Sequence, residues 1–79
     1  MTRERLRQFI TTDLAVDIES CDDDALLFSD GILDSLHLLE IIALLESEPG
    51  LRVGASEVSL ANFDSINRML SYLERKRSS

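Results

Sequence analysis

The chain has 79 residues, of which 44% are hydrophobic but only 5% aromatic. A chain of this length forms one domain, here 1–79, near the size at which a single apolar core is just sufficient. A core made mainly of Leu, Ile and Val favours packed helices over a sheet. The single cysteine, Cys21, excludes an internal disulfide and favours a reducing compartment. No apolar run is long enough to span a membrane, and Met1–Phe9 is too charged for a secretory signal, so we expect a cytoplasmic protein.

Acidic residues are concentrated in the middle of the chain, and the net charge is −7. Thirteen of them lie between Asp13 and Asp64, against Arg52 as the one basic residue of that stretch. Such a surface repels nucleic acid and attracts basic faces of other proteins. The acidic run Asp22–Asp24 lacks the alternating ligands and the glycine of a calcium loop, so no metal site is expected.

The spacing of apolar residues predicts four helices. The first follows Thr2, its N-cap, and ends near Asp13. The second covers Ser35–Glu48 and stops at Pro49-Gly50, since both residues break helices. Two more complete the prediction: a short helix from Ser56 to about Leu60, and a last one that starts near Asp64 or Ser65 and ends in Arg75, Lys76 and Arg77.

A long connection, 15–34, joins the first two predicted helices. A structureless loop of that length is unusual in a small domain unless it is functional or packs against the core. We expect Leu27 and Phe28 to anchor it. Gly31 is expected to supply the conformational freedom for the turn into the second helix.

The second predicted helix has two apolar faces. One set is expected to face the core: Leu38, Ile41, Ile42 and Leu45. A second set, which we call the docking strip, lies on the opposite side and consists of Leu36, Leu39 and Ala43 with the carboxylates Glu40 and Glu46. Periodicity alone leaves two interpretations open: the strip packs under the long loop, or it binds basic partner proteins. The adjoining Ser35 favours the second interpretation.

Ser35 at the start of this helix has three possible roles. It could cap the helix, although Asp34 could do so equally well. It could be a nucleophile with His37 as its base, but residues two apart on a helix do not face each other, so hydrolase chemistry is not expected. It could be a point of covalent attachment, where a phosphodiester would lie beside free N–H groups at the positive end of the helix dipole. The charge of Asp34 opposes that anion.

The segment Asp30-Gly31-Ile32-Leu33-Asp34-Ser35-Leu36, with the apolar helix after it, resembles the acyl and peptidyl carrier proteins. The similarity extends over essentially the whole chain. It implies a four-helix bundle with a short third helix and a long loop between the first two helices. It also implies 4′-phosphopantetheine, donated by coenzyme A, on Ser35, with Asp34 recognised by the modifying phosphopantetheinyl transferase.

The resemblance further implies a function. The arm holds an acyl, aminoacyl or peptidyl intermediate as a thioester, and the protein itself, a monomer, catalyses nothing. Its partners would be the transferase, an adenylating or acyl-loading enzyme, and downstream synthases or transferases of fatty acid, polyketide or nonribosomal peptide biosynthesis. Partner contact is carried over to Leu36, Leu39, Glu40, Ala43 and Glu46.

The chain departs from the family pattern in two places. Pro49-Gly50 stands where an aromatic residue is frequent, and Leu51 is expected to fill that space. Ala43 is smaller than the frequent Met or Val, which is expected to flatten the docking strip. The segment Val58–Ile66 looks most like free-standing aminoacyl or specialised extender-unit carriers. The alternative function is an unmodified helical adaptor that binds a partner through Leu36, Leu39 and Ala43.

Overall fold

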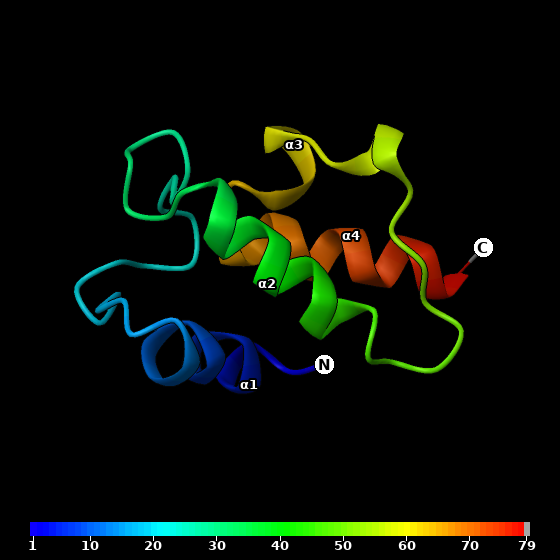
Figure 1. Cartoon of the computed structure of the whole chain (residues 1–79), viewed down its shortest axis with the longest axis horizontal. Coiled ribbons are helices and arrows are strands. Elements are labelled where there is room, and N and C mark those ends of the chain that lie inside the picture. The colour runs from blue at the N-terminus through cyan, green and yellow to red at the C-terminus, as the bar shows by residue number, and fades with distance from the viewer. Residues whose placement is uncertain (79) are drawn as a thin grey trace.

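The structure, a computed structural model, describes residues 1–78. Over that range every regular element is a helix, which confirms the predicted all-α fold. The elements are α1 (Arg3–Gln8), which continues as the π-helical turn η1 (Phe9–Asp13), α2 (Ser35–Leu45), the 3₁₀ turn η2 (Ala55–Glu57), the short α3 (Leu60–Phe63) and α4 (Ile66–Ser78). Figure 1 shows α2 crossing in front of α4, with α1 below them and α3 above. None of the helices in residues 1–78 has the length and apolar character needed to cross a bilayer.

The first helical segment and the last helix start where the sequence predicts. The Thr2 side chain accepts a hydrogen bond from the Arg5 N–H, so Thr2 is the N-cap of α1. The Ser65 hydroxyl accepts one from the Arg68 N–H at the start of α4. Both contacts satisfy N–H groups that a helix leaves without an intrahelical partner.

Two predicted boundaries are wrong. Helix α2 ends at Leu45, three residues before the predicted Glu48. The N–H groups of Ser47 and Glu48 bond only three residues back, and Pro49 disfavours helical geometry in the residue before it. The short helix is α3, which follows Ser59, whereas Ser56 lies inside η2. The Glu57 carboxylate closes that turn by accepting from the Gly54 N–H, so Ser56 caps nothing.

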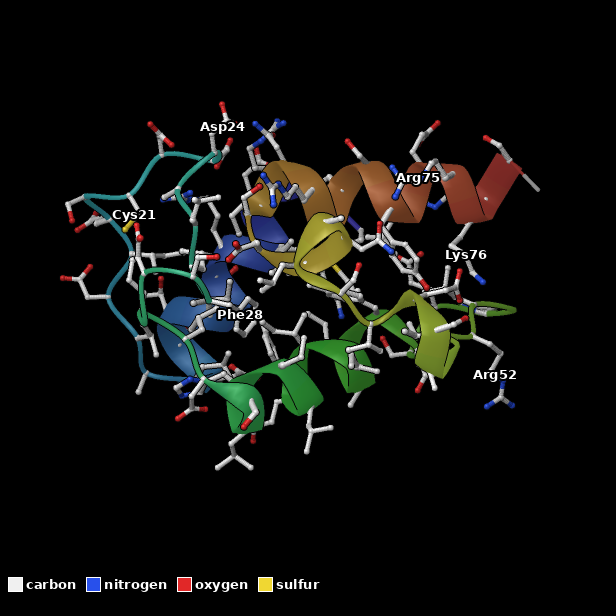
Figure 2. The ribbon with its side chains drawn as sticks, turned by 90° about the horizontal axis from the view of Figure 1, so that it is seen from above. Cys21, Asp24, Phe28, Arg52, Arg75 and Lys76 are labelled. Carbon is white, nitrogen blue, oxygen red and sulfur yellow. The ribbon has the colours of Figure 1, made fainter. Side chains whose placement is uncertain are left out.

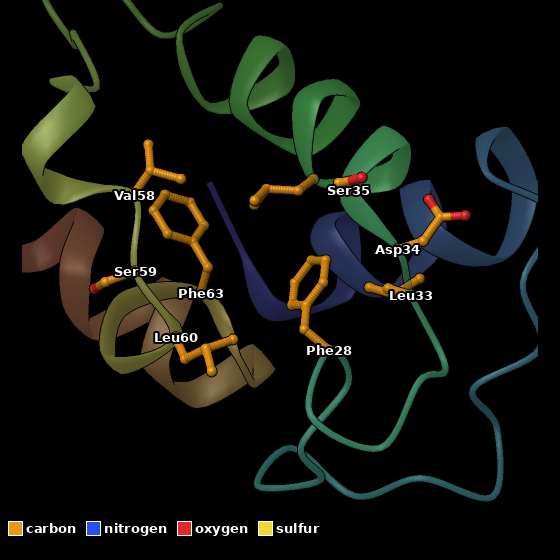
Figure 3. Close-up of a pocket in the computed structure, with 9 residues that line it drawn as sticks. Phe28, Leu33, Asp34, Ser35, Val58, Ser59, Leu60 and Phe63 are labelled. Carbon is orange, nitrogen blue, oxygen red and sulfur yellow. The ribbon is translucent and has the colours of Figure 1, made fainter.

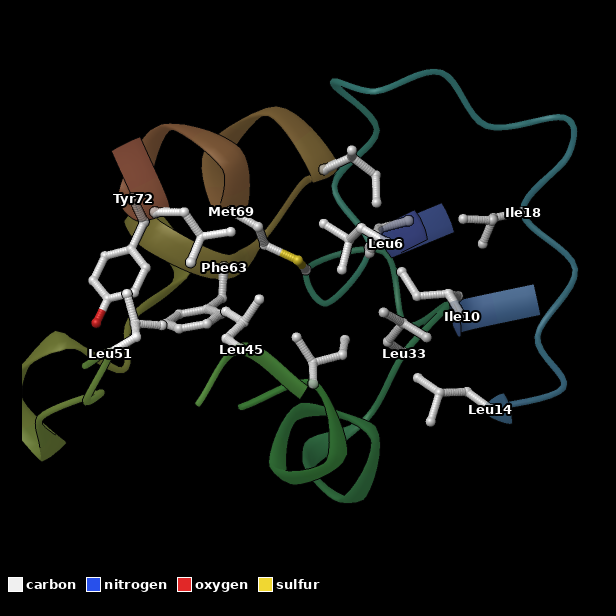
Figure 4. Close-up of a cluster of buried hydrophobic side chains, with 14 residues drawn as sticks. Leu6, Ile10, Leu14, Ile18, Leu33, Leu45, Leu51, Phe63, Met69 and Tyr72 are labelled. Carbon is white, nitrogen blue, oxygen red and sulfur yellow. The ribbon is translucent and has the colours of Figure 1, made fainter. Parts of the chain in front are cut away.

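The core lies between α1, α2 and α4, and Figure 4 shows that it is almost entirely aliphatic. Its aromatic part is the pair Phe63 and Tyr72, whose ring centroids are 5.3 Å apart. Leu51 is buried in this core, as predicted. The complete set of buried apolar side chains is Leu6, Ile10, Leu14, Ile18, Leu27, Leu33, Ile41, Leu45, Leu51, Phe63, Ile66, Met69, Tyr72 and Leu73.

The long connection between η1 and α2 packs against the helices. Leu27 is buried, as predicted, while Phe28 is only half-buried. The sequence reasoning missed two further anchors, Ile18 and Leu33, which are also buried. Gly31 has φ +77°, the left-handed conformation expected at this turn.

Polar contacts fix the same loop from two sides. From α1, the Arg7 guanidinium donates to the carbonyls of Ile18 (2.9 Å) and Cys21 (2.7 Å) and pairs with Asp23 at 2.8 Å. From the residue after α3, the Asp64 carbonyl accepts from the Leu27 N–H at 2.7 Å. The loop therefore presents the start of α2 from a fixed position.

The basic residues of α4 have structural partners. Arg75 donates to the Asn62 side chain at 2.7 Å, and Lys76 pairs with Glu57 at 3.1 Å. Figure 2 shows Arg75 and Lys76 at the opposite end of the molecule from Cys21 and Asp24. These contacts hold α4 to the segment 57–62.

Candidate functional site

Asp34 is the N-cap of α2. Its Oδ1 accepts from the N–H groups of Leu36 (3.0 Å) and His37 (3.1 Å). In return, Nδ1 of His37 accepts from the Asp34 N–H at 3.2 Å, which completes a reciprocal capping box. This arrangement uses the imidazole in place of the Glu or Gln usual at that position. His37 therefore stabilises the helix start, a role that the sequence reasoning missed although the three-residue spacing could have indicated it.

Ser35 is the first residue of α2, and its side chain is exposed. Since Asp34 supplies the cap, the capping role considered for Ser35 is excluded. The hydroxyl makes no hydrogen bond to any residue in 1–78. It is thus both accessible and chemically uncommitted.

The free N–H groups expected around Ser35 are mostly occupied. The Asp34 carboxylate takes those of Leu36 and His37, so an anion on Ser35 cannot use them. The hydrogen bond from the His37 N–H lowers the pKa of Asp34, against a smaller opposing effect of desolvation, and the nearby imidazole and the Leu36 N–H lower it further. Asp34 is therefore a carboxylate at neutral pH, directly before the serine.

A cleft of about 390 Å³ opens beside Ser35, between α2 and the segment that leads into α3. Figure 3 shows Asp34 and Ser35 on one side of it and Val58, Ser59 and Leu60 on the other. The lining is mostly apolar and consists of Phe28, Leu33, Asp34, Ser35, Leu38, Val58, Ser59, Leu60 and Phe63. The sequence reasoning placed none of Val58, Ser59 and Leu60 at the site, because their proximity to Ser35 exists only in the folded chain.

The loop side of this cleft is held by Asp64, a carboxylate with 1% exposure. Its Oδ1 accepts from the N–H groups of Phe28 (2.8 Å) and Ser29 (2.9 Å), and its Oδ2 accepts from the Ser29 hydroxyl. Burial on its own would raise the pKa of Asp64, but these hydrogen bonds, with the charge of Arg68, lower it. The buried charge thus has the partners it requires.

The docking strip is largely exposed. Leu36 and Leu39 are 66% and 63% exposed, so neither packs under the long loop. Ala43 and Glu40 are exposed beside them. Glu46 differs, because its carboxylate accepts from the Val53 N–H at 3.0 Å and so holds the loop after α2.

Comparison with known proteins agrees with this geometry. Residues 4–73 match the family model described as "Phosphopantetheine attachment site". The chain is 36% identical to "Polyketide-8 synthase acyl carrier protein 2" of Streptomyces avermitilis over 59 residues. This aligned stretch covers 75% of this chain and 68% of that protein. It is 28% identical over 78 residues to an acyl carrier protein of Aster yellows witches'-broom phytoplasma, covering 99% of this chain and all of the relative. An acyl carrier protein of Thermotoga maritima is 29% identical over 72 residues, 91% of this chain and 86% of the relative.

The chain belongs to the acyl carrier protein family, whose members bear a phosphopantetheine attachment site. It is a carrier and not an enzyme, and its cofactor is 4′-phosphopantetheine bound covalently to a serine. As a carrier domain it interacts with partner enzymes.

Proposed function

We propose that Ser35 bears the 4′-phosphopantetheine arm and that residues 1–79 act as one carrier domain. The observation that carries this proposal is the exposed hydroxyl of Ser35, which the Asp34 cap leaves without a structural task. A transferase needs such a hydroxyl, since a serine engaged in capping would have to break its hydrogen bond before reacting. Asp34, fixed one residue earlier, is the recognition carboxylate.

The modification is a phosphoryl transfer from coenzyme A. The Ser35 Oγ attacks the phosphorus that bears the pantetheine, and the hydroxyl proton leaves. The phosphoanhydride bond from that phosphorus to the departing adenosine 3′,5′-bisphosphate breaks, and a phosphodiester bond to Ser35 forms in its place. The transferase supplies the base and the electrostatic stabilisation, because no side chain within residues 1–78 hydrogen-bonds the Ser35 hydroxyl.

The thiol at the end of the arm then holds an acyl, aminoacyl or peptidyl group as a thioester. Tethering keeps this group at high effective concentration near any docked enzyme. The apolar cleft beside Ser35 is suited to the arm or a short apolar cargo, since its volume is about 390 Å³ and its walls are aliphatic and aromatic.

The partners are proposed to be a phosphopantetheinyl transferase, a loading enzyme that adenylates or transfers the acyl group, and downstream synthases or transferases. They would contact Leu36, Leu39, Glu40, Ala43 and Glu46 on a monomeric carrier in the cytoplasm. One relative is named for a polyketide synthase. That name supports a biosynthetic pathway of the fatty acid or polyketide type.

The test is incubation of the purified chain with coenzyme A and a broad-specificity transferase, followed by intact-mass measurement. One phosphopantetheine should be added to the wild type. Ser35→Ala should remain unmodified. Ser56→Ala removes another exposed hydroxyl, one that makes no hydrogen bond to residues 1–78, and should be modified like the wild type. Modification of Ser35→Ala would refute the assignment.

The sequence also left an unmodified adaptor open, because the exposed Leu36 and Leu39 suit binding without any arm, but the match of residues 4–73 to a phosphopantetheine attachment site argues against it. An adaptor predicts an unchanged mass in the same reaction and partner binding that is indifferent to Ser35→Ala. The mass measurement therefore separates the two functions directly.

A further inference from the structure

A second hollow, distinct from the cleft beside Ser35, lies between η1 and α2. Its volume is about 560 Å³, and its lining is Phe9, Asp13, Leu14, Glu40, Ala43 and Leu44. A smaller hollow of about 230 Å³ shares Phe9, Asp13 and Leu44 with it and extends along α1 to Arg5. We call the two together the η1–α2 groove.

The groove has an apolar floor that is only partly covered. Phe9 and Leu44 pack against the core but remain half-buried, while Leu14 beneath them is buried. Ala43 ends at its Cβ, so α2 has no side chain long enough to close the groove at that point. The small residue at position 43 thus adjoins a hollow rather than the flat surface expected from the sequence.

Backbone geometry keeps this floor open. The Leu14 N–H bonds to the Phe9 carbonyl, five residues back, which widens the turn over Phe9–Asp13 compared with an α-helix. Residues four apart share one side of this turn, which places Phe9 and Asp13 together on the groove. Ala15, at φ +57°, then turns the chain away from η1.

The rim is acidic where the groove meets the docking strip. Asp13 and Glu40 line it, both are exposed, and neither makes an ion pair within residues 1–78. Glu40 and Ala43 also belong to the docking strip, so the groove continues that surface across to η1. Arg5 lines only the smaller hollow, so the acidic part of the groove is the part shared with the docking strip. The apolar floor, the two unpaired carboxylates and the continuity with the docking strip together define the chemistry of the occupant.

We propose that the η1–α2 groove is a second docking site, which receives an apolar side chain of a basic partner protein while the partner's Lys or Arg side chains reach Asp13 and Glu40. The inference rests on the proposed function, because it extends the surface that partner enzymes would use. Phe9 and Asp13 thereby join the partner-binding residues, and Ala43 determines which partners fit.

The test uses a synthetic helical peptide that presents one leucine between two arginines, each one helical turn away. Amide chemical shifts of the isotopically labelled chain are followed during titration. Saturable changes are expected at Phe9, Asp13, Ala43 and Leu44. A peptide with serine in place of the leucine should bind about ten-fold more weakly or worse, because it loses the burial of one leucine.

Two substitutions with matched controls sharpen the test. Ala43→Met should fill the hollow and weaken binding about ten-fold or more, whereas Ala55→Met, at an exposed position of η2, should not change it. Asp13→Asn should weaken binding about two- to five-fold, whereas Glu74→Gln, which removes one charge from the exposed face of α4, should have no effect. All four positions are exposed, so folding should be preserved, and thermal midpoints check this.

Several outcomes would overturn the proposal. The peptide could cause no saturable shifts, or shifts confined to Leu36 and Leu39, or it could bind Ala43→Met as tightly as the wild type. Groove shifts that depend on the concentration of the chain itself, without peptide, would show that the occupant is a second copy of the chain. Arm addition, measured by mass on the same samples, reports separately on Ser35. Normal arm addition without peptide binding would refute the groove alone, and peptide binding without arm addition would refute the proposed function.

Discussion

Asp64 and Ser29 are joined by two hydrogen bonds, one from the Ser29 N–H at 2.9 Å and one from its hydroxyl. Asp64 directly precedes Ser65, the cap of α4, whereas Ser29 lies in the loop that leads to Ser35. The pair therefore connects the start of α4 to the segment that positions Ser35, the proposed attachment site. The buried Asp64 carboxylate therefore helps to fix the position of the loop that leads to Ser35.

Asp64→Asn should destabilise the fold by about 1–3 kcal/mol, since the amide has a single oxygen and its NH₂ would replace the oxygen that accepts from the Ser29 hydroxyl. Urea unfolding at neutral pH measures this loss. Asp30→Asn, an exposed carboxylate in the same loop, should change stability by less than about 0.5 kcal/mol. Equal effects of the two substitutions would show that the Asp64 contacts do not hold the loop.

Acid should destabilise the wild type more than Asp64→Asn. The pKa of Asp64 is lowered in the folded chain, so its contribution is complete above the carboxyl's ordinary pKa of 3.8 and is lost as the pH falls through the lower folded value. Thermal midpoints between neutral pH and about pH 2.5 should fall for both proteins. A parallel fall in wild type and variant would contradict the assignment of this carboxylate.

Two substitutions of Asp34 should distinguish its role as helix cap from its proposed role in recognition by the transferase. Asp34→Asn keeps an acceptor oxygen for the Leu36 and His37 N–H groups, so its thermal midpoint should stay close to that of the wild type. Asp34→Ala removes the cap and should lower the midpoint by roughly 5 °C. Arm addition should be slowed in both variants if the transferase reads the carboxylate. Normal kinetics with Asp34→Asn would reduce Asp34 to a structural cap.

Leu27 and Leu39 should respond oppositely to truncation. Leu27 is 1% exposed, so Leu27→Ala should cost about 2–5 kcal/mol, a large part of the stability of a domain of this size. Leu39→Ala should change stability by less than about 0.5 kcal/mol, because the side chain is mostly in solvent. Its effect should appear instead as weaker binding to partner enzymes, measured by the KM of the transferase. A large loss of stability for Leu39→Ala would place that residue in the core.

Tyr72 offers a spectroscopic test at the alkaline end, because it is the single tyrosine of a chain without tryptophan. Burial, followed by the charge of Glu57, raises the pKa of Tyr72 to about 12, so tyrosinate absorbance should appear only near that pH. The pH dependence is opposite to that of Asp64. The protonated Tyr72 contributes its full share to stability below its ordinary pKa of 10.0, and this contribution is lost as the pH rises towards 12. The hydroxyl has no hydrogen-bond partner within residues 1–78, so Tyr72→Phe should leave stability unchanged or raise it by about 1 kcal/mol. Titration near pH 10 would show that the ring is accessible.

Local sequence patterns were enough to predict several features of the fold and of the site. Thr2 and Ser65 cap helices because short polar side chains satisfy N–H groups wherever a helix begins. The angular position of Leu36 and Leu39 placed them on the face of α2 opposite the core, and the structure then showed that the loop leaves both exposed. Asp34 and Ser35 are adjacent in sequence, so their proximity did not depend on the fold.

Other features were decided only by the tertiary structure. Asp64 meets Ser29 across 35 positions of sequence, and Val58 and Leu60 reach the cleft of Ser35 from a different element. No periodicity encodes such distances, because they depend on how helices pack around a shared core. The loop after α2 is likewise held by a contact that no helical pattern predicts, the hydrogen bond from the Val53 N–H to the Glu46 carboxylate. The sequence by itself pointed to Ser35 as the residue we propose to be modified, and packing determined what surrounds it. Local patterns set helix faces, whereas only burial of the common core brings distant segments together.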